Sequence, residues 1–72
     1  MRLNSEKKIK EVLQKIKKER VKLGWSQYEI GVKLHISQNA YYKLETGKTK
    51  LDLQRFIEIT NLLEIKPEKL LQ

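Results

Sequence analysis

The sequence has no cysteine, one histidine and no long run of apolar residues. Without cysteine the chain forms neither disulfides nor thiolate metal sites, and a single histidine cannot build a metal site alone. No stretch approaches the roughly 18 apolar residues of a membrane-spanning helix, and the N-terminal MRLNSEKKIK lacks the apolar core of a signal peptide. We therefore expect a cytoplasmic protein without cofactor or metal, stabilised by packing alone.

Residue patterns that support catalysis are also missing. The sequence contains no glycine-rich phosphate loop and no pair of cysteine or histidine residues, and its carboxylates are scattered over capping and surface positions. These absences predict that the chain is not an enzyme, that it has no catalytic residues, and that it binds no small molecule.

Positive charge, in contrast, is abundant and unevenly placed. Sixteen Lys and Arg residues against nine Asp and Glu give a net charge of +7. The excess is +6 in residues 1–24 (nine against three), +2 in residues 25–50 (four against two) and −1 in residues 51–72 (three against four). A basic front and a near-neutral rear suit a protein that presents one end to a polyanion and keeps the other for a partner. For the N-terminal lysines alone, a solvated helix face is the alternative interpretation.

The segment of residues 25–47, WSQYEIGVKLHISQNAYYKLETG, contains the start signals of two short helices. Ser26 is an N-cap candidate, and Glu29 three residues later completes a capping box. Ser37 is a second N-cap candidate, and the turn around His35 is too short for antiparallel helices. The segment therefore predicts a helix-turn-helix, whose second helix fits the major groove of DNA.

The whole chain is expected to form one all-α domain, residues 1–72, with helices at roughly 5–23, 26–34, 37–45, 52–63 and 67–71. Ser5 opens the first helix, Gly24 ends it, Asp52 caps the fourth, and Pro67 takes the first position of the fifth. Helical spacing assigns two core stripes, composed of Ile9, Val12, Leu13, Ile16 and Leu23 in the first helix, and of Leu53, Phe56, Ile59, Thr60 and Leu63 in the fourth.

Arg20 lies in the middle of the apolar stripe of the first helix. A guanidinium cannot lose its charge, so a buried arginine must be paired with an acid. Few acids are candidates, and Glu45 at the end of the second motif helix is the best one. We therefore predict a structural ion pair between Arg20 and Glu45.

Over about residues 12–71 the chain resembles the Cro/CI-type (xenobiotic-response-element-type, XRE) helix-turn-helix regulators, which include the lambdoid phage repressors. The marks of this resemblance are Arg20, Ser26-Gln27, Ile30-Gly31, Leu34, Ile36-Ser37, Leu44-Glu45, Gly47 and the basic loop Lys48-Thr49-Lys50. The resemblance implies a compact five-helix, lambda-repressor-like domain that binds double-stranded DNA. It also implies that residues at the places of Arg20 and Glu45 pair across the fold.

The chain departs from the family pattern at three positions. Gly31 stands where the family usually has alanine, which still permits close helix approach. His35 stands where a glycine with positive φ is common, and histidine is among the residues that tolerate this conformation. Tyr41 replaces the usual Ile or Val, so we expect a mostly buried ring whose hydroxyl reaches the rim.

The recognition helix is expected to begin at Gln38. Its outward face contains the candidate base contacts Gln38, Asn39, Tyr42 and Lys43. Glutamine and asparagine can pair with adenine and lysine with guanine, whereas Tyr42 can instead pack on the sugar-phosphate backbone. The candidate phosphate contacts are Gln27, Ser37, Lys48, Thr49 and Lys50, and the resemblance implies that the glutamine grips the DNA backbone.

The favoured function is a sequence-specific transcriptional regulator, a small stand-alone repressor acting as a dimer on a palindromic operator. At 72 residues we expect no separate sensor domain. The alternative is a protein-interaction adaptor or antitoxin-type module that keeps the fold with DNA binding secondary. A membrane-surface role for the basic first helix is disfavoured, because its apolar face contains Arg20 and is needed for the core.

Dimerisation is expected because one recognition helix reads only a few base pairs. The near-neutral C-terminal third has more apolar residues than one core face can absorb. The interface candidates are Ile57, Leu62, Ile65, Leu70 and Leu71. Ile65 and Leu70 are also candidates for the core, and a monomer whose C-terminal leucines close its own core is the alternative.

Overall fold

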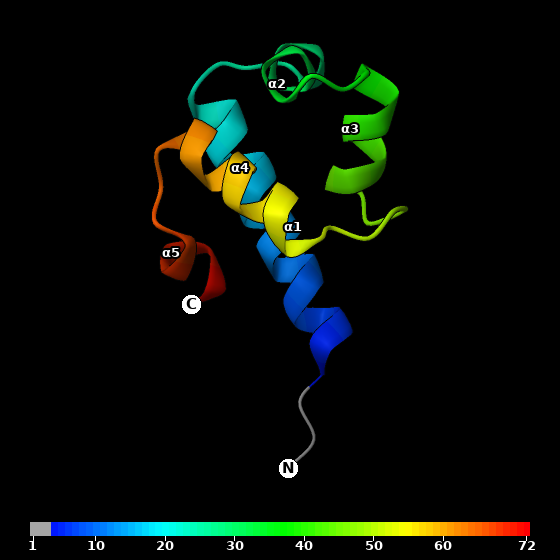
Figure 1. The fold of residues 1–72 in the computed structure, drawn as a ribbon. Helices are drawn as coiled ribbons and strands as arrows, with labels where there is room; N and C mark the ends of the chain where they lie inside the picture. Colours follow the sequence, from blue (N-terminus) through cyan, green and yellow to red (C-terminus); the bar gives the residue numbers. More distant parts are fainter. Residues whose placement is uncertain (1–3) are drawn as a thin grey trace.

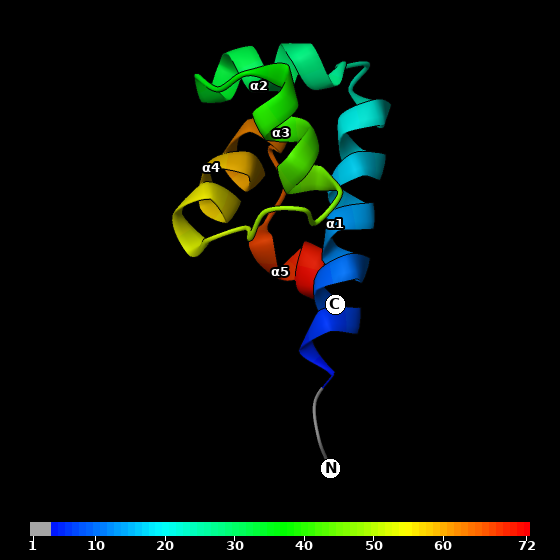
Figure 2. The same cartoon turned by 90° about the vertical axis from the view of Figure 1, so that its right-hand side faces the viewer.

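Five helices make up the part of the chain that the computed structural model describes, residues 4–72. They are α1 (Ser5–Lys22), α2 (Gln27–Leu34), α3 (Gln38–Glu45), α4 (Leu53–Leu63) and α5 (Pro67–Leu71). Their ends lie within one residue of the predicted positions, and the all-α fold is confirmed. The long helix α1 forms one side of the molecule, with α2 and α3 at one end of it and α5 packed near the other (Figures 1 and 2).

The sequence signals at the helix starts are present as hydrogen bonds. Ser26 and Glu29 form a reciprocal capping box, in which each side chain accepts from the backbone N–H of the other at 3.0 Å. The Ser37 hydroxyl oxygen accepts from Ala40 N, and Asp52 caps α4 in the same way. Helix α1 begins at Ser5 as predicted, and its N-cap is Asn4, for which the sequence analysis made no prediction.

Two helices end in a non-glycine residue with left-handed backbone. His35 follows α2 with φ of 62°, and Glu64 follows α4 with φ of 54°. The conformation at His35 lets the chain turn sharply within a few residues, which places the start of α3 directly after α2. A glycine, Gly24 at φ of 77°, follows the end of α1 as predicted.

The core lies between α1 and the four shorter helices. Its buried apolar residues come from all five helices: Val12, Leu13, Ile16, Ile30, Leu34, Tyr41, Phe56, Ile59, Leu63 and Leu70. Thr60 is also buried, and its hydroxyl donates to Ile57 O at 2.8 Å. Because each helix contributes at least one residue, no helix can leave without exposing part of this cluster.

Three residues predicted for the core are exposed instead. Ile9 is 53% exposed, Leu23 46% and Leu53 73%. The first turns of α1 extend past α5 (Figure 2), and Ile9, in the second turn of this helix, is left uncovered. Ile9 and Leu53 line an apolar groove with Leu51 and Phe56 between α1 and the start of α4.

The C-terminal apolar residues divide into two groups. Leu70 is 1% exposed and fills the core, which corrects its assignment to a dimer interface. Leu62 and Ile65 are half-buried and pack against the core. Ile57 and Leu71 are 44% and 50% exposed and remain at the surface. Among residues 4–72, no helix is long and apolar enough to cross a membrane.

Candidate nucleic-acid interface

Helices α2 and α3 meet at very close range, and Gly31 makes this approach possible. A Cβ atom on Gly31 would lie 3.1 Å from the carbonyl oxygen of Ile36 and 3.4 Å from that of Ser37. The backbone of Ile36 also donates to Gly31 O at 2.9 Å. This tight junction fixes the angle at which α3 leaves α2, and hence the face that α3 presents.

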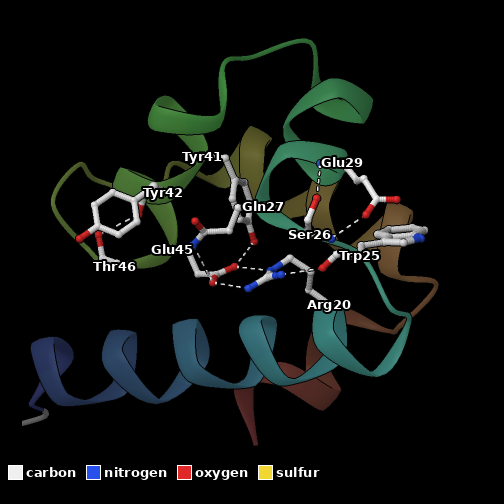
Figure 3. Close-up of polar contacts among 9 residues, drawn as sticks. All are labelled: Arg20, Trp25, Ser26, Gln27, Glu29, Tyr41, Tyr42, Glu45 and Thr46. Atoms are coloured by element: carbon white, nitrogen blue, oxygen red, sulfur yellow. Dashed lines mark hydrogen bonds and ion pairs between the residues drawn. The ribbon is translucent and has the colours of Figure 1, made fainter.

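Helix α3 has an exposed outward face and a buried inward face. The four predicted base-contact residues all have exposed side chains: Gln38, Asn39, Tyr42 and Lys43. Tyr41 has no exposed surface and Glu45 is 8% exposed, and both point toward α1. Figure 3 shows Tyr42 directed away from this interior side. The arrangement leaves a row of hydrogen-bonding side chains free on the surface.

The inward face is anchored by the predicted ion pair. Arg20 donates from Nε to Oε2 of Glu45 at 2.9 Å and from a terminal nitrogen to Oε1 at 3.0 Å. Its other terminal nitrogen donates to the carbonyl oxygen of Trp25 at 2.6 Å. This two-point contact ties the end of α1 to the end of α3 and to the segment before α2 (Figure 3).

Two further donors converge on the same carboxylate. The Tyr41 hydroxyl donates to Oε2 of Glu45, so it turns inward, and the expectation that it reaches the rim was wrong. Gln27 donates from Nε2 to Oε1 at 3.3 Å. Burial alone would raise the pKa of Glu45, but hydrogen bonds from Arg20 and Tyr41 outweigh it and lower this pKa. Burial and the neighbouring Glu45 raise the pKa of Tyr41.

Gln27 therefore occupies a position between interior and surface. It lies in the first turn of α2, half-buried, with its amide nitrogen committed to Glu45. The hydrogen bond to Glu45 uses neither the second hydrogen on that nitrogen nor the backbone N–H of Gln27. A helix N-terminus with free N–H groups favours an anion. Ser37, another predicted phosphate contact, uses its oxygen as the cap of α3 and keeps its hydroxyl proton for another acceptor.

The basic loop after α3 is fixed to that helix by its backbone. The N–H groups of Lys48 and Thr49 both donate to the carbonyl oxygen of Lys43, at 2.9 and 3.1 Å. The side chains of Lys48, Thr49 and Lys50 are all exposed. The loop and the recognition helix thus present their polar groups as one unit.

A helix-turn-helix family matches residues 16–70, most of the chain. The chain belongs to the Cro/CI-type helix-turn-helix family. Comparisons with curated proteins and with solved structures find no match. The family match and the geometry agree that α2 and α3 are the helix-turn-helix and that this domain binds DNA.

One residue near the outward face of α3 was not identified from the sequence. Arg55, in the first turn of α4, lines a surface hollow together with Asn39, Lys43 and Lys50. Its guanidinium donates to Leu34 O at 3.4 Å and to Glu58 at 3.0 Å, and this holds it near the end of α2. Arg55 is far from the recognition helix in sequence, so only the fold brings these three cations together.

The acidic residues near the helix-turn-helix are part of its hydrogen-bonding framework. Across residues 4–72 no group of three or more histidine, cysteine or acidic side chains is arranged to hold a metal ion. Instead, the acidic residues that lie near the helix-turn-helix have structural roles. Glu29 completes a cap, and the N–H and hydroxyl of Ser26 lower its pKa.

Proposed function

We propose that this domain is a transcriptional repressor that recognises a specific sequence of double-stranded DNA through the outward face of α3. The observation that supports the proposal most strongly is the pairing of that face with the hollow formed by Lys43, Lys50 and Arg55. Hydrogen-bonding side chains for base edges thus lie beside cations for phosphates, as duplex recognition requires.

The base contacts follow from side-chain chemistry. Gln38 and Asn39 begin α3, and their amides can pair with N6 and N7 of adenine in the major groove. Lys43, one turn later, can donate to O6 and N7 of guanine. Tyr42 lies between them and can contact a base or the sugar-phosphate backbone.

Phosphate contacts are proposed for the two sides of α3. On one side lie Gln27 at the start of α2 and Ser37 at the cap of α3. On the other side lies the loop of Lys48, Thr49 and Lys50. Such contacts supply most of the affinity and fix the register of the protein on the duplex, but they do not select sequence.

The dimeric operator complex is also a proposal. A twofold dimer places two recognition helices on half-sites about one helical turn apart, which makes the operator a palindrome. Ile57 and Leu71 supply exposed apolar surface for this dimer, and Leu62 and Ile65 are half-buried residues of the same C-terminal third. A dimer bound in this way represses by excluding other proteins from the same DNA, in the cytoplasm. The proposed partners are DNA and a second copy of the chain, without catalysis.

The proposal is tested by selecting binding sites from a random duplex library. Replacement of Gln38, Asn39 and Lys43 by alanine removes up to three base contacts, each worth ~1–3 kcal/mol of discrimination. We expect the triple variant to lose the sequence preference of the wild type.

The control for this experiment is Gln14→Ala with Lys18→Ala, which removes two exposed polar side chains of α1, one of them a cation. We expect this variant to keep the wild-type preference. If the triple variant selects the same site with unchanged discrimination, α3 does not read the DNA sequence.

A further inference from the structure

Lys48 makes a contact that its role as a phosphate ligand does not require. Its ammonium nitrogen lies 5.1 Å from the centroid of the Tyr42 ring. Tyr42 is 38% exposed, on the outward face of α3 among the candidate base contacts. A cation at this distance over an aromatic face is attracted to the ring.

The backbone around this pair limits where both side chains can go. The Tyr42 carbonyl oxygen accepts from the N–H of Thr46 at 3.0 Å and from its hydroxyl at 2.7 Å (Figure 3). The N–H of Lys48 donates to Lys43 O at 2.9 Å, and Gly47 turns the chain with φ of 79°. The main chain therefore brings Lys48 back over the ring that precedes it by six residues.

Among the residues that the structure describes, no acid pairs with the Lys48 ammonium in competition with the ring. Within residues 4–72 Lys48 forms no ion pair, and the ion pairs that are present join residues of α1, α3 and α4. Lys50, two residues later in the same exposed loop, has the same charge but no aromatic ring within cation–π distance among the described residues. The two lysines of this loop thus have the same chemistry and different neighbours.

We propose that Lys48 is a specificity-determining residue, because its ammonium fixes the orientation of the Tyr42 ring on the recognition face. The proposal rests on the DNA binding proposed above and extends it. Lys50 contributes charge alone, so its loss weakens all duplexes equally. Lys48 contributes charge and ring orientation, so its loss also weakens the preference for the cognate duplex. The pair is a positioning device for one side chain.

The experiment compares Lys48→Met, Lys48→Arg and the matched control Lys50→Met. For each protein, Kd is measured at one salt concentration for the selected site and for a scrambled duplex of equal length. We expect Lys50→Met to raise both Kd values by the same factor. Lys48→Met is expected also to lower the ratio of the Kd for the scrambled duplex to the Kd for the selected site. The expected decrease is about two- to fivefold, the range of an exposed cation–π contact. Lys48→Arg preserves the ratio, because arginine keeps a cation over the ring.

The same comparison in a Tyr42→Ala background isolates the ring. There Lys48→Met and Lys50→Met are expected to have equal effects on the ratio. If Lys48→Met and Lys50→Met have equal effects on the ratio when Tyr42 is present, the proposal is overturned. It is also overturned if their effects remain unequal in the Tyr42→Ala background.

A measurement without DNA separates this proposal from the proposed function. The ring current of Tyr42 shifts the ε-methylene protons of Lys48 upfield in NMR spectra of the free domain, and Tyr42→Ala abolishes the shift. If the shift is absent, the contact does not exist in solution and the inference is wrong. If the shift is present but no duplex is preferred, the proposed function fails and the specificity role fails with it. If a duplex is preferred and the ratio does not respond to Lys48→Met, only the specificity role is wrong.

Discussion

At the residue scale, the side chain of Glu45 is the point at which the interior and the proposed DNA-binding surface meet. Its two oxygens accept from two nitrogens of Arg20, from the Tyr41 hydroxyl and from the Gln27 amide. No buried side-chain polar atom of residues 4–72 lacks a hydrogen-bond partner. A carboxylate with this many donors remains ionised in the interior, because the donors replace the water that it has lost.

Truncation of one member of this network leaves a buried charge without a partner. We predict that Glu45→Ala lowers the free energy of unfolding by ~3–5 kcal/mol, because Arg20 is 7% exposed and cannot shed its charge. Replacing its three buried members with apolar side chains, as Arg20→Met, Tyr41→Phe and Glu45→Met together, is expected to cost less. Urea denaturation of both variants measures the difference, and an unchanged stability of Glu45→Ala contradicts the role of the pair.

The same carboxylate predicts a dependence of stability on pH. The folded state lowers the pKa of Glu45 from its ordinary value of 4.5. Its contribution is therefore complete above that value and is lost as the pH falls through the lower pKa of the folded state. We expect wild type to lose more stability between pH 7 and pH 3 than the triple apolar variant, measured by thermal melts.

The triple apolar variant is the control for the wild type in this series, since it lacks Glu45 but retains Glu29, the other acid with a lowered pKa. Stability curves that stay parallel through the acid range would show that Glu45 makes no pH-dependent contribution.

At the scale of the elements, the helices follow from local signals that act within a few residues. Caps at Ser26, Ser37 and Asp52 set three of the helix starts, and each was predictable because a cap needs only its own N–H partner three residues away. The start of α1 at Ser5 was also predicted, but its cap was not identified, because Asn4 and Ser5 are adjacent and both are good capping residues. Burial was less predictable, since helical periodicity identifies a side of the helix but not the neighbour that covers it.

At the candidate site, contacts between residues that are distant in the sequence could be predicted only in part. The pair of Arg20 and Glu45 was predictable because burial of a permanent charge demands an acid. The bonds of Gln27 and Tyr41 to the same acid were not, because both side chains can also be satisfied by water. Arg55 joined the site only through the packing of α4 against α2.

The left-handed helix ends give a prediction of stabilisation. His35 and Glu64 adopt a backbone conformation that costs a side-chain-bearing residue roughly 1–2 kcal/mol and glycine almost nothing. Glycine also increases the entropy of the unfolded chain, which offsets part of this gain. We expect Glu64→Gly to raise the stability by a few tenths to ~1 kcal/mol, and His35→Gly to do likewise.

Thr46 is the matched position for this test. It ends α3 with φ of −93°, in the ordinary right-handed region. Thr46→Gly is therefore expected to destabilise the domain in the same thermal melt. A stabilisation of all three variants, or of none, contradicts the assignment of strain to the left-handed ends.

At the scale of the whole molecule, the excess of positive charge lies toward the N-terminal end of the sequence, and the C-terminal third is near neutral. The described residues extend over 40 × 23 × 19 Å, with α1 along one side and the helix-turn-helix at one end (Figure 2). The near-neutral α4 and α5 keep Ile57 and Leu71 exposed. Association through α4 and α5 would leave the outward face of α3 free for DNA.

This arrangement predicts how dimerisation responds to substitution. Sedimentation at high micromolar concentration, with and without a palindromic duplex, is expected to show a dimer of the wild type. Ile57→Glu with Leu71→Glu introduces buried charge into the proposed interface, so we expect monomers. The control Val21→Glu alters an apolar residue of α1 that is 57% exposed, and it should leave the dimer intact. A monomeric wild type, or a dimer that survives the double substitution, contradicts this interface.

The division of α3 into an inward and an outward face also has an evolutionary consequence. Tyr41 and Glu45 hold the helix in place, whereas Gln38, Asn39 and Lys43 are exposed and make no side-chain hydrogen bond to any other described residue. Substitutions at such positions generally change stability by less than about 0.5 kcal/mol. New operator preferences can therefore arise one mutation at a time without loss of the fold, so paralogues of this domain can diverge in target while they remain interchangeable in structure.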